Sequence, residues 1–149
     1  MQNFLYDALK GKADHVFLLY GDNSDKENTE IRGRLKQVPG SESLVLVATG
    51  QKIGEGFDFP RLDVLMLAAP VSFEGRLEQY VGRLNRDYVG KEAVYVYDYI
   101  DSHVRYFDKM YAKRLRTYRK TGFSIWTQES QPKQLVNAIF DSVNYTEKI

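Results

Sequence analysis

Three polar side chains, spaced four and then three residues apart, form the pattern with the clearest chemical potential in this chain. Gln79, Arg83 and Arg86 follow an apolar run, and their spacing places all three on one side of a helix. A guanidinium group presents several N–H donors in a fixed plane, so two arginines beside an amide suit a phosphate group. The pattern therefore predicts a helix face that binds phosphate, and a solvated polar face is the ordinary structural alternative.

A second set of candidate residues lies upstream, at the ends of apolar runs and in a Gly-rich loop. Asp58 stands in Gly-Phe-Asp-Phe-Pro, where a carboxylate can accept hydrogen bonds from a ligand, and Gly56 would let backbone approach closely. A turn aspartate that bonds its own backbone explains Asp58 equally well. Thr49 and Gly21 each follow an apolar run, so we expect both at the carboxyl edge of a sheet, where open α/β sheets bind ligands. A strand-end threonine that caps a turn is the structural alternative for Thr49.

The elements that must position these residues alternate along the chain. Short apolar runs predict strands at 15–20, 44–48, 63–68 and 93–97, and periodicity with capping signals predicts helices at 4–9, 25–36, 75–85 and 103–120. We expect an irregular loop at 50–60, a short strand at 123–127 and a turn or two of helix at 135–140. The alternation predicts an α/β fold with a mostly parallel sheet and helices on both faces. The run at 15–20 is nearly all apolar, which predicts a strand covered on both sides.

The expected helix at 103–120 carries two different stripes. The apolar stripe, expected to be buried, comprises Val104, Phe107, Tyr111, Leu115 and Tyr118. The basic stripe comprises Arg105, Lys109, Lys113, Arg116 and Lys120. A solvated face is the ordinary reading of such a basic stripe, and contact with nucleic acid or a neighbouring domain is the alternative.

Composition limits the class of protein without naming a partner. The 149 residues carry a net charge of +1, so any contact with nucleic acid must come from a local patch. The chain has no cysteine, which excludes disulfides and thiolate metal sites, and we assign no role to its two histidines, His15 and His103. No apolar run is long enough to span a membrane, and no signal peptide is evident, so we expect a cytoplasmic protein with no membrane contact.

Two segments of the chain resemble a known family. The segments VLVATGQKIGEGFDFPRLDVLMLAAP and QYVGRLNR are similar to motifs V and VI of superfamily 2 helicases and translocases. Their sequences most resemble those of DEAD/DEAH-like helicases of bacterial defence systems, including type III restriction subunits. The resemblance covers about residues 5–122. It implies that residues 1–122 are the second, C-terminal RecA-like domain, and that residues 123–149 are an extension or a linker to a further domain. Because the first expected helix has no strand before it, we expect the domain to lack its first strand.

The resemblance also implies roles for the candidate residues. Arg83 and Arg86, with Gln79 beside them, would reach the γ-phosphate of ATP and act as arginine fingers. Asp58 would accept hydrogen bonds from the ribose, and Gly56 would lie against the nucleotide. The remaining two candidates, Thr49 and Gly21, would contact the phosphate backbone of DNA or RNA, without reading its sequence.

The chain carries only half of the motifs that such a motor needs. It has no Gly-x-x-x-x-Gly-Lys-[Ser/Thr] loop and no acidic motif of the kind that holds magnesium. In the family both lie on the N-terminal RecA-like domain, so the resemblance implies that ATP and Mg²⁺ bind between that domain and this one. We therefore expect the chain to be inactive alone.

Three functional classes follow from these patterns. The first is a motor domain of an ATP-dependent helicase or translocase, and the second is a RecA-like scaffold or nucleic-acid-binding module without catalysis. The intact line of Gln79, Arg83 and Arg86 favours the motor, because a scaffold has no need to keep it. The third, a Rossmann-type enzyme, lacks the expected Gly-x-Gly-x-x-Gly segment after a first strand.

Overall fold

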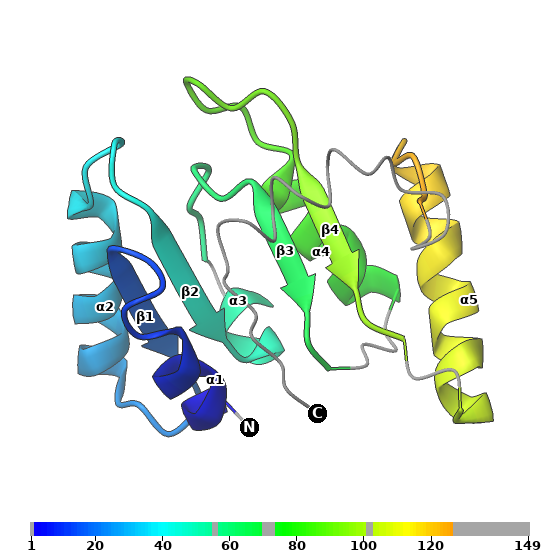
Figure 1. The fold of residues 1–149 in the computed structure, drawn as a ribbon, viewed down its shortest axis with the longest axis horizontal. Helices are drawn as coiled ribbons and strands as arrows, with labels where there is room; N and C mark the ends of the chain where they lie inside the picture. The colour runs from blue at the N-terminus through cyan, green and yellow to red at the C-terminus, as the bar shows by residue number, and fades with distance from the viewer. Residues whose placement is uncertain (1, 55–56, 70–73, 101–102, 127–149) are drawn as a thin grey trace.

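The computed structural model describes residues 2–54, 57–69, 74–100 and 103–126, in which helices and strands alternate (Figure 1). In chain order the elements are α1 (Gln2–Leu9), β1 (His15–Leu19), α2 (Asp25–Gln37), β2 (Leu44–Ala48), α3 (Gly50–Gly54), β3 (Val64–Leu67), α4 (Glu74–Leu84), β4 (Tyr95–Asp98) and α5 (Arg105–Lys120). The predicted α/β class is therefore confirmed, and most elements lie where the sequence patterns place them.

All strand pairing in the described residues is parallel, and it occurs in two separate pairs. β1 pairs with β2, with His15 opposite Leu44, and β3 pairs with β4, with Val64 opposite Tyr95. No hydrogen-bonded ladder joins β2 to β3 within the described part of the chain. Figure 1 shows the four strands pointing the same way, in the order β1 to β4. The expected parallel sheet is thus built as two halves.

Helix α2 packs against β1 and completes the core of the first half. The N-terminal end of this helix has the predicted capping box: the Ser24 hydroxyl accepts from the Glu27 N–H, and the Glu27 carboxylate accepts from the Ser24 N–H at 2.8 Å. Leu35 of α2 is buried with Phe17 and Leu19 of β1 and with Phe57. Helices α1 and α2 both contact β1, which was predicted to be covered on both sides, but the two faces are not buried to the same extent. The alternate residues of β1 are only half-buried, because the short helix α1 contacts the strands without burying any residue of its own.

The second half has its own core, made by Leu67, Leu77, Val81 and Tyr118. These residues come from β3, α4 and α5, so two helices cover one face of the β3–β4 pair. The other face leaves apolar side chains in water; it exposes Val64 (40%), Met66 (55%) and Tyr95 (43%).

The buried face of α5 differs from the predicted apolar stripe. Its buried residues are Met110, Arg114, Thr117 and Tyr118; Val104 precedes the helix and is exposed, and Phe107, Tyr111 and Leu115 are only half-buried. Compared with the prediction, the buried face lies further around the helix axis, because the Arg114 side chain points inward. Its Nε and Nη2 donate to the two carboxylate oxygens of Asp98 on β4 at 2.7 and 2.9 Å. The Tyr118 hydroxyl donates to the same carboxylate at 2.8 Å, and burial raises the pKa of that phenol.

Two further expectations are corrected. Residues 50–54 form the one-turn helix α3, where an irregular loop was predicted, because the Thr49 carbonyl accepts from the N–H groups of Lys52 and Ile53. Residues 123–126 form no strand; Phe123 and Ile125 pack against the second core instead. Thr127 and the helix expected at 135–140 lie outside the described residues. Within the described ranges, no helix has both the length and the apolar character needed to cross a bilayer.

The buried ion pair of α5 and β4 supports a stability prediction. Arg114→Met should lower the free energy of unfolding by about 3 kcal/mol, because it leaves the Asp98 carboxylate buried without its cation. Lys113→Met, at the exposed neighbouring position, should change it by less than about 0.5 kcal/mol. Urea unfolding followed by circular dichroism measures both, and equal midpoints for the two variants would contradict the assignment.

Candidate functional site

Two arginines at the end of α4 contact the segment that joins β2 to β3. The Arg83 guanidinium donates to the Ile53 carbonyl at the end of α3, and the Arg86 Nη1 donates to the Asp58 carboxylate at 2.8 Å. Helix α4 itself ends at Leu84, so Arg86 reaches Asp58 from the turn that follows the helix. The structure therefore brings together Arg86 and Asp58, which are 28 positions apart in the sequence and which the patterns singled out independently.

Solvent access differs between these two arginines. Arg83 is half-buried, whereas the side chains of Arg86 and Asp58 are 53% and 55% exposed. An ion pair exposed to this extent contributes at most about 1 kcal/mol, because water and salt screen it. A doubly charged phosphate could therefore compete with Asp58 for the Arg86 guanidinium.

A tyrosine adds a third contact between α4 and residues 50–60 of the segment that joins β2 to β3; we call this region of contact the joint. The Tyr80 hydroxyl donates to the Gly50 carbonyl at 2.7 Å, and burial raises the pKa of this phenol. A side chain at position 50 would collide with that hydroxyl, so this close approach requires glycine. The start of α3 is thus held against α4.

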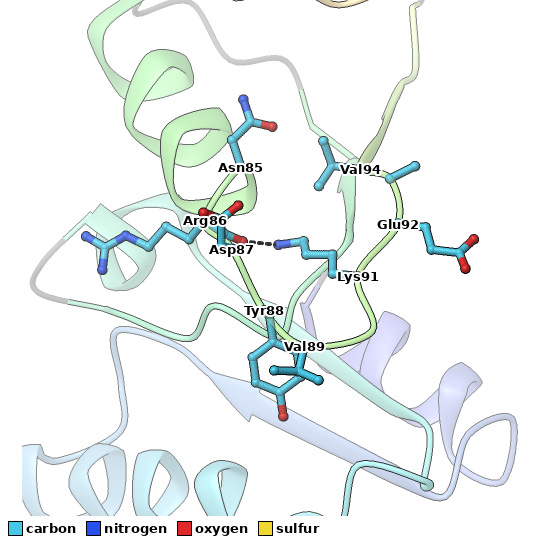
Figure 2. A pocket seen from close by; sticks show the side chains of 9 residues that line it. Asn85, Arg86, Asp87, Tyr88, Val89, Lys91, Glu92 and Val94 are labelled. Carbon is cyan, nitrogen blue, oxygen red and sulfur yellow. Dashed lines mark hydrogen bonds between the residues drawn. The ribbon is translucent and has the colours of Figure 1, made fainter.

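A lysine beyond α4, Lys91, also links the end of that helix to the segment that joins β2 to β3. The Lys91 ammonium donates to the carbonyls of Pro60 at 2.9 Å and of Arg86 at 3.0 Å, and also to the Leu84 carbonyl. Figure 2 shows this side chain reaching across the hollow formed by residues 85–94 toward the backbone of Arg86. Burial lowers the pKa of Lys91. One cation therefore links the C-terminal end of α4 to the loop that carries Asp58.

Gln79 and Gly56 are the other two residues predicted to lie at the nucleotide. Gln79 lies on α4 with its side chain exposed, and Gly56 lies outside the described residues. Among the residues that the structure describes, no group of three histidine, aspartate or glutamate side chains is placed to hold a metal ion.

Thr49 and Gly21 lie at a common edge of the first half. β1 and β2 end opposite each other, at Leu19 and Ala48, so the two candidates follow neighbouring strand ends. The Thr49 N–H donates to the Leu19 carbonyl at 3.2 Å, and Gly21 is exposed in the turn after β1. The Thr49 carbonyl also begins α3 by accepting from the N–H groups of Lys52 and Ile53, a backbone contact that does not depend on the threonine side chain.

Sequence reasoning missed Tyr80 and Lys91. Their partners are backbone carbonyls, which have no residue-type signature. The one available signal for the lysine is Gly90 before it, whose φ of 84° marks a tight turn that aims the next side chain back at the helix end.

Comparison with known proteins relates the chain to several viral proteins, one of which is named as a helicase. It is 32% identical over 124 residues to "Putative helicase 161L" of Invertebrate iridescent virus 6, a match that covers 82% of this chain and 24% of that protein. It is 30% identical over 88 residues to transcript termination protein A18 of Yaba-like disease virus, covering 59% of this chain and 18% of that protein. The chain thus spans about a quarter or less of these two relatives.

A shorter relative is matched over most of its length. Uncharacterized protein 108L of Invertebrate iridescent virus 3 is 34% identical over 101 residues, which cover 67% of this chain and 90% of that protein. No protein-family model matches the chain.

The lysine contact generates the prediction for this site. Lys91→Met should lower the free energy of unfolding by about 1 kcal/mol or more, because three carbonyls lose a charged donor. It should also move the Arg86 Nε–H resonance toward that of a solvent-exposed arginine, since the turn that places Arg86 is released. Glu92→Gln, at the exposed adjacent position, is the matched control. Chemical denaturation and ¹H–¹⁵N spectra test this, and an unmoved Arg86 signal would show that Lys91 does not position it.

Proposed function

We propose that this chain, which belongs to the same family as uncharacterized protein 108L of Invertebrate iridescent virus 3, is the C-terminal RecA-like motor domain of an ATP-dependent nucleic-acid helicase or translocase. The observation that carries the proposal is the meeting of Arg83 and Arg86 with the Asp58 loop. It joins the two segments on which the resemblance to superfamily 2 rests. The similarity to "Putative helicase 161L" supports the same class.

In this role the arginines act on the phosphates of ATP. When bound, ATP with Mg²⁺ would supply the γ-phosphoryl group, and its negative charge fits the donors of Arg83, Arg86 and Gln79. Guanidinium groups aimed at the transferring phosphoryl stabilise the charge on its oxygens, and such fingers accelerate the reaction by about a thousand-fold or more. Asp58, released from Arg86, would accept from the ribose hydroxyls, with Gly56 beside it. The phosphate loop and the magnesium ligands would come from the N-terminal RecA-like domain.

Nucleic acid would run past the ends of β1 and β2. Thr49 offers a hydroxyl and Gly21 a backbone N–H at that edge, and both suit phosphate oxygens of DNA or RNA. These contacts would follow the backbone without regard to sequence.

One observation favours the catalytically inert alternative, a RecA-like scaffold or nucleic-acid-binding module. The Arg83 guanidinium donates to Ile53 and the Arg86 guanidinium to Asp58, so both cations have structural partners within the chain. A protein with no catalysis could use them to join its two halves.

Turnover in the longer protein separates these candidates. In a protein that carries this chain with its phosphate-loop domain, Arg83→Ala and Arg86→Ala should each cut ATP turnover by at least about a hundred-fold, with much less change in ATP affinity. Arg86→Lys should rescue poorly, because the planar fork is lost. Lys36→Ala, on the exposed side of α2, is the control. Near-normal turnover in both alanine variants would show that the two arginines have only a structural role, and absence of turnover in the unsubstituted protein would favour the inert scaffold.

The chain on its own supports a complementary prediction. Purified by itself it should show no ATP hydrolysis, because the proposed site needs the phosphate loop of another domain. Adding that domain as a separate polypeptide should restore some turnover. Hydrolysis by the chain alone that survives repurification and is lost in Arg86→Ala would contradict the half-site arrangement.

A further inference from the structure

Positive charge in this protein is concentrated on one helix. α5 contains seven basic residues and one acidic residue, Asp108, a net charge of +6, whereas the whole chain carries only +1. The rest of the molecule is therefore net negative. Figure 1 shows α5 at the far end of the fold from β1 and β2, packed beside α4.

The basic residues of α5 are arranged as a continuous exposed face. They recur every three or four residues, which on a helix spaces successive cations by about 5–6 Å along the axis. This basic face consists of Arg105, Lys109, Lys113, Arg116 and Lys120, all exposed. It points away from the buried residues Met110, Arg114 and Thr117. At its C-terminal end this face forms an exposed ion pair, in which the Glu78 carboxylate lies 2.8 Å from the Lys120 ammonium.

An aromatic side chain borders this basic face. Tyr106 is 64% exposed, and its position seven residues before Lys113 places it on the same side of α5. An exposed tyrosine next to cations is the arrangement that binds unpaired bases, since every base has a flat face and only unpaired strands present it.

We infer that the basic face of α5, together with Tyr106, is a second contact surface for single-stranded nucleic acid, separate from the edge at Thr49 and Gly21. The inference takes the kind of partner from the proposed function but requires no ATP chemistry. α5 is about 24 Å long, and even an unpaired strand extended to about twice the 3.4 Å per-phosphate rise of a duplex strand would place several phosphates alongside it. A lipid surface fits less well, because a membrane-bound helix inserts its apolar face, and that face of α5 is packed in the core.

The test uses the chain itself and a fluorescently labelled, mixed-sequence single strand of 20 nucleotides, titrated at several salt concentrations. The triple variant Arg105→Gln, Lys109→Gln, Lys113→Gln should bind about ten-fold more weakly at low salt, and its salt slope should fall by about 2. The control triple Lys12→Gln, Lys26→Gln, Lys36→Gln removes the same charge from exposed positions elsewhere and should change binding less than two-fold. Tyr106→Ala should weaken binding of the single strand but not of a duplex.

Several results would overturn the inference. Equal losses in the two triple variants would show a general charge effect, and an unaffected α5 variant beside a weakened Thr49→Val would place all binding at the strand ends. Vesicles containing phosphatidylserine that bind as tightly as the strand, with the same loss in the α5 variant, would make the face a lipid surface. Failure of the wild-type chain to bind the strand at low salt would also refute it. None of these results depends on whether Arg83 and Arg86 act in catalysis, so the two proposals stand or fall separately.

Discussion

The joint between the two halves of the fold is the constraint on which the site depends. Each half has its own parallel strand pair and its own buried cluster, and no strand ladder connects them within the described residues. The connection is made largely by side chains on and just beyond α4, namely Tyr80, Arg83, Arg86 and Lys91, which donate to residues 50–60. The geometry of the candidate site is therefore set by long polar side chains, with the hydrophobic cores holding their helices and loops in place.

The chemistry of this joint suits groups that must later change partners. Lys91 lies at the C-terminal end of α4, where the free carbonyls and the helix dipole favour a cation. Its three acceptors are backbone atoms, so it can remain in place while a ligand binds. Arg86, by contrast, is exposed and held by a screened ion pair with Asp58, which costs little to break. The stable and the exchangeable contacts are thus carried by different residues a few positions apart.

The sequence predicted the element positions well and the side-chain partners poorly. Helix and strand limits follow from local signals, such as the capping box at Ser24 and Glu27, and these act within a few residues. The face that α5 buries could not be predicted, because Arg114 is polar by type and becomes a core residue only through Asp98 on a distant strand. The contacts of Lys91 could not be predicted either, because its acceptors are backbone carbonyls that only the fold brings together. The convergence of Arg86 on Asp58 was only implied by resemblance, since spacing shows which residues share a helix face and not what that face meets.

The double use of the arginines has an evolutionary consequence. The presence of Arg83 and Arg86 indicates an active motor only if an inert descendant is free to lose them. Because they also hold α4 to residues 53–58, their loss would weaken the fold whether or not the protein hydrolyses ATP. Purifying selection on folding alone would then preserve the motif after catalysis had gone. The two arginines alone would then not distinguish an active motor from an inert relative, and substitutions at an exposed position such as Gln79 would be more informative about activity.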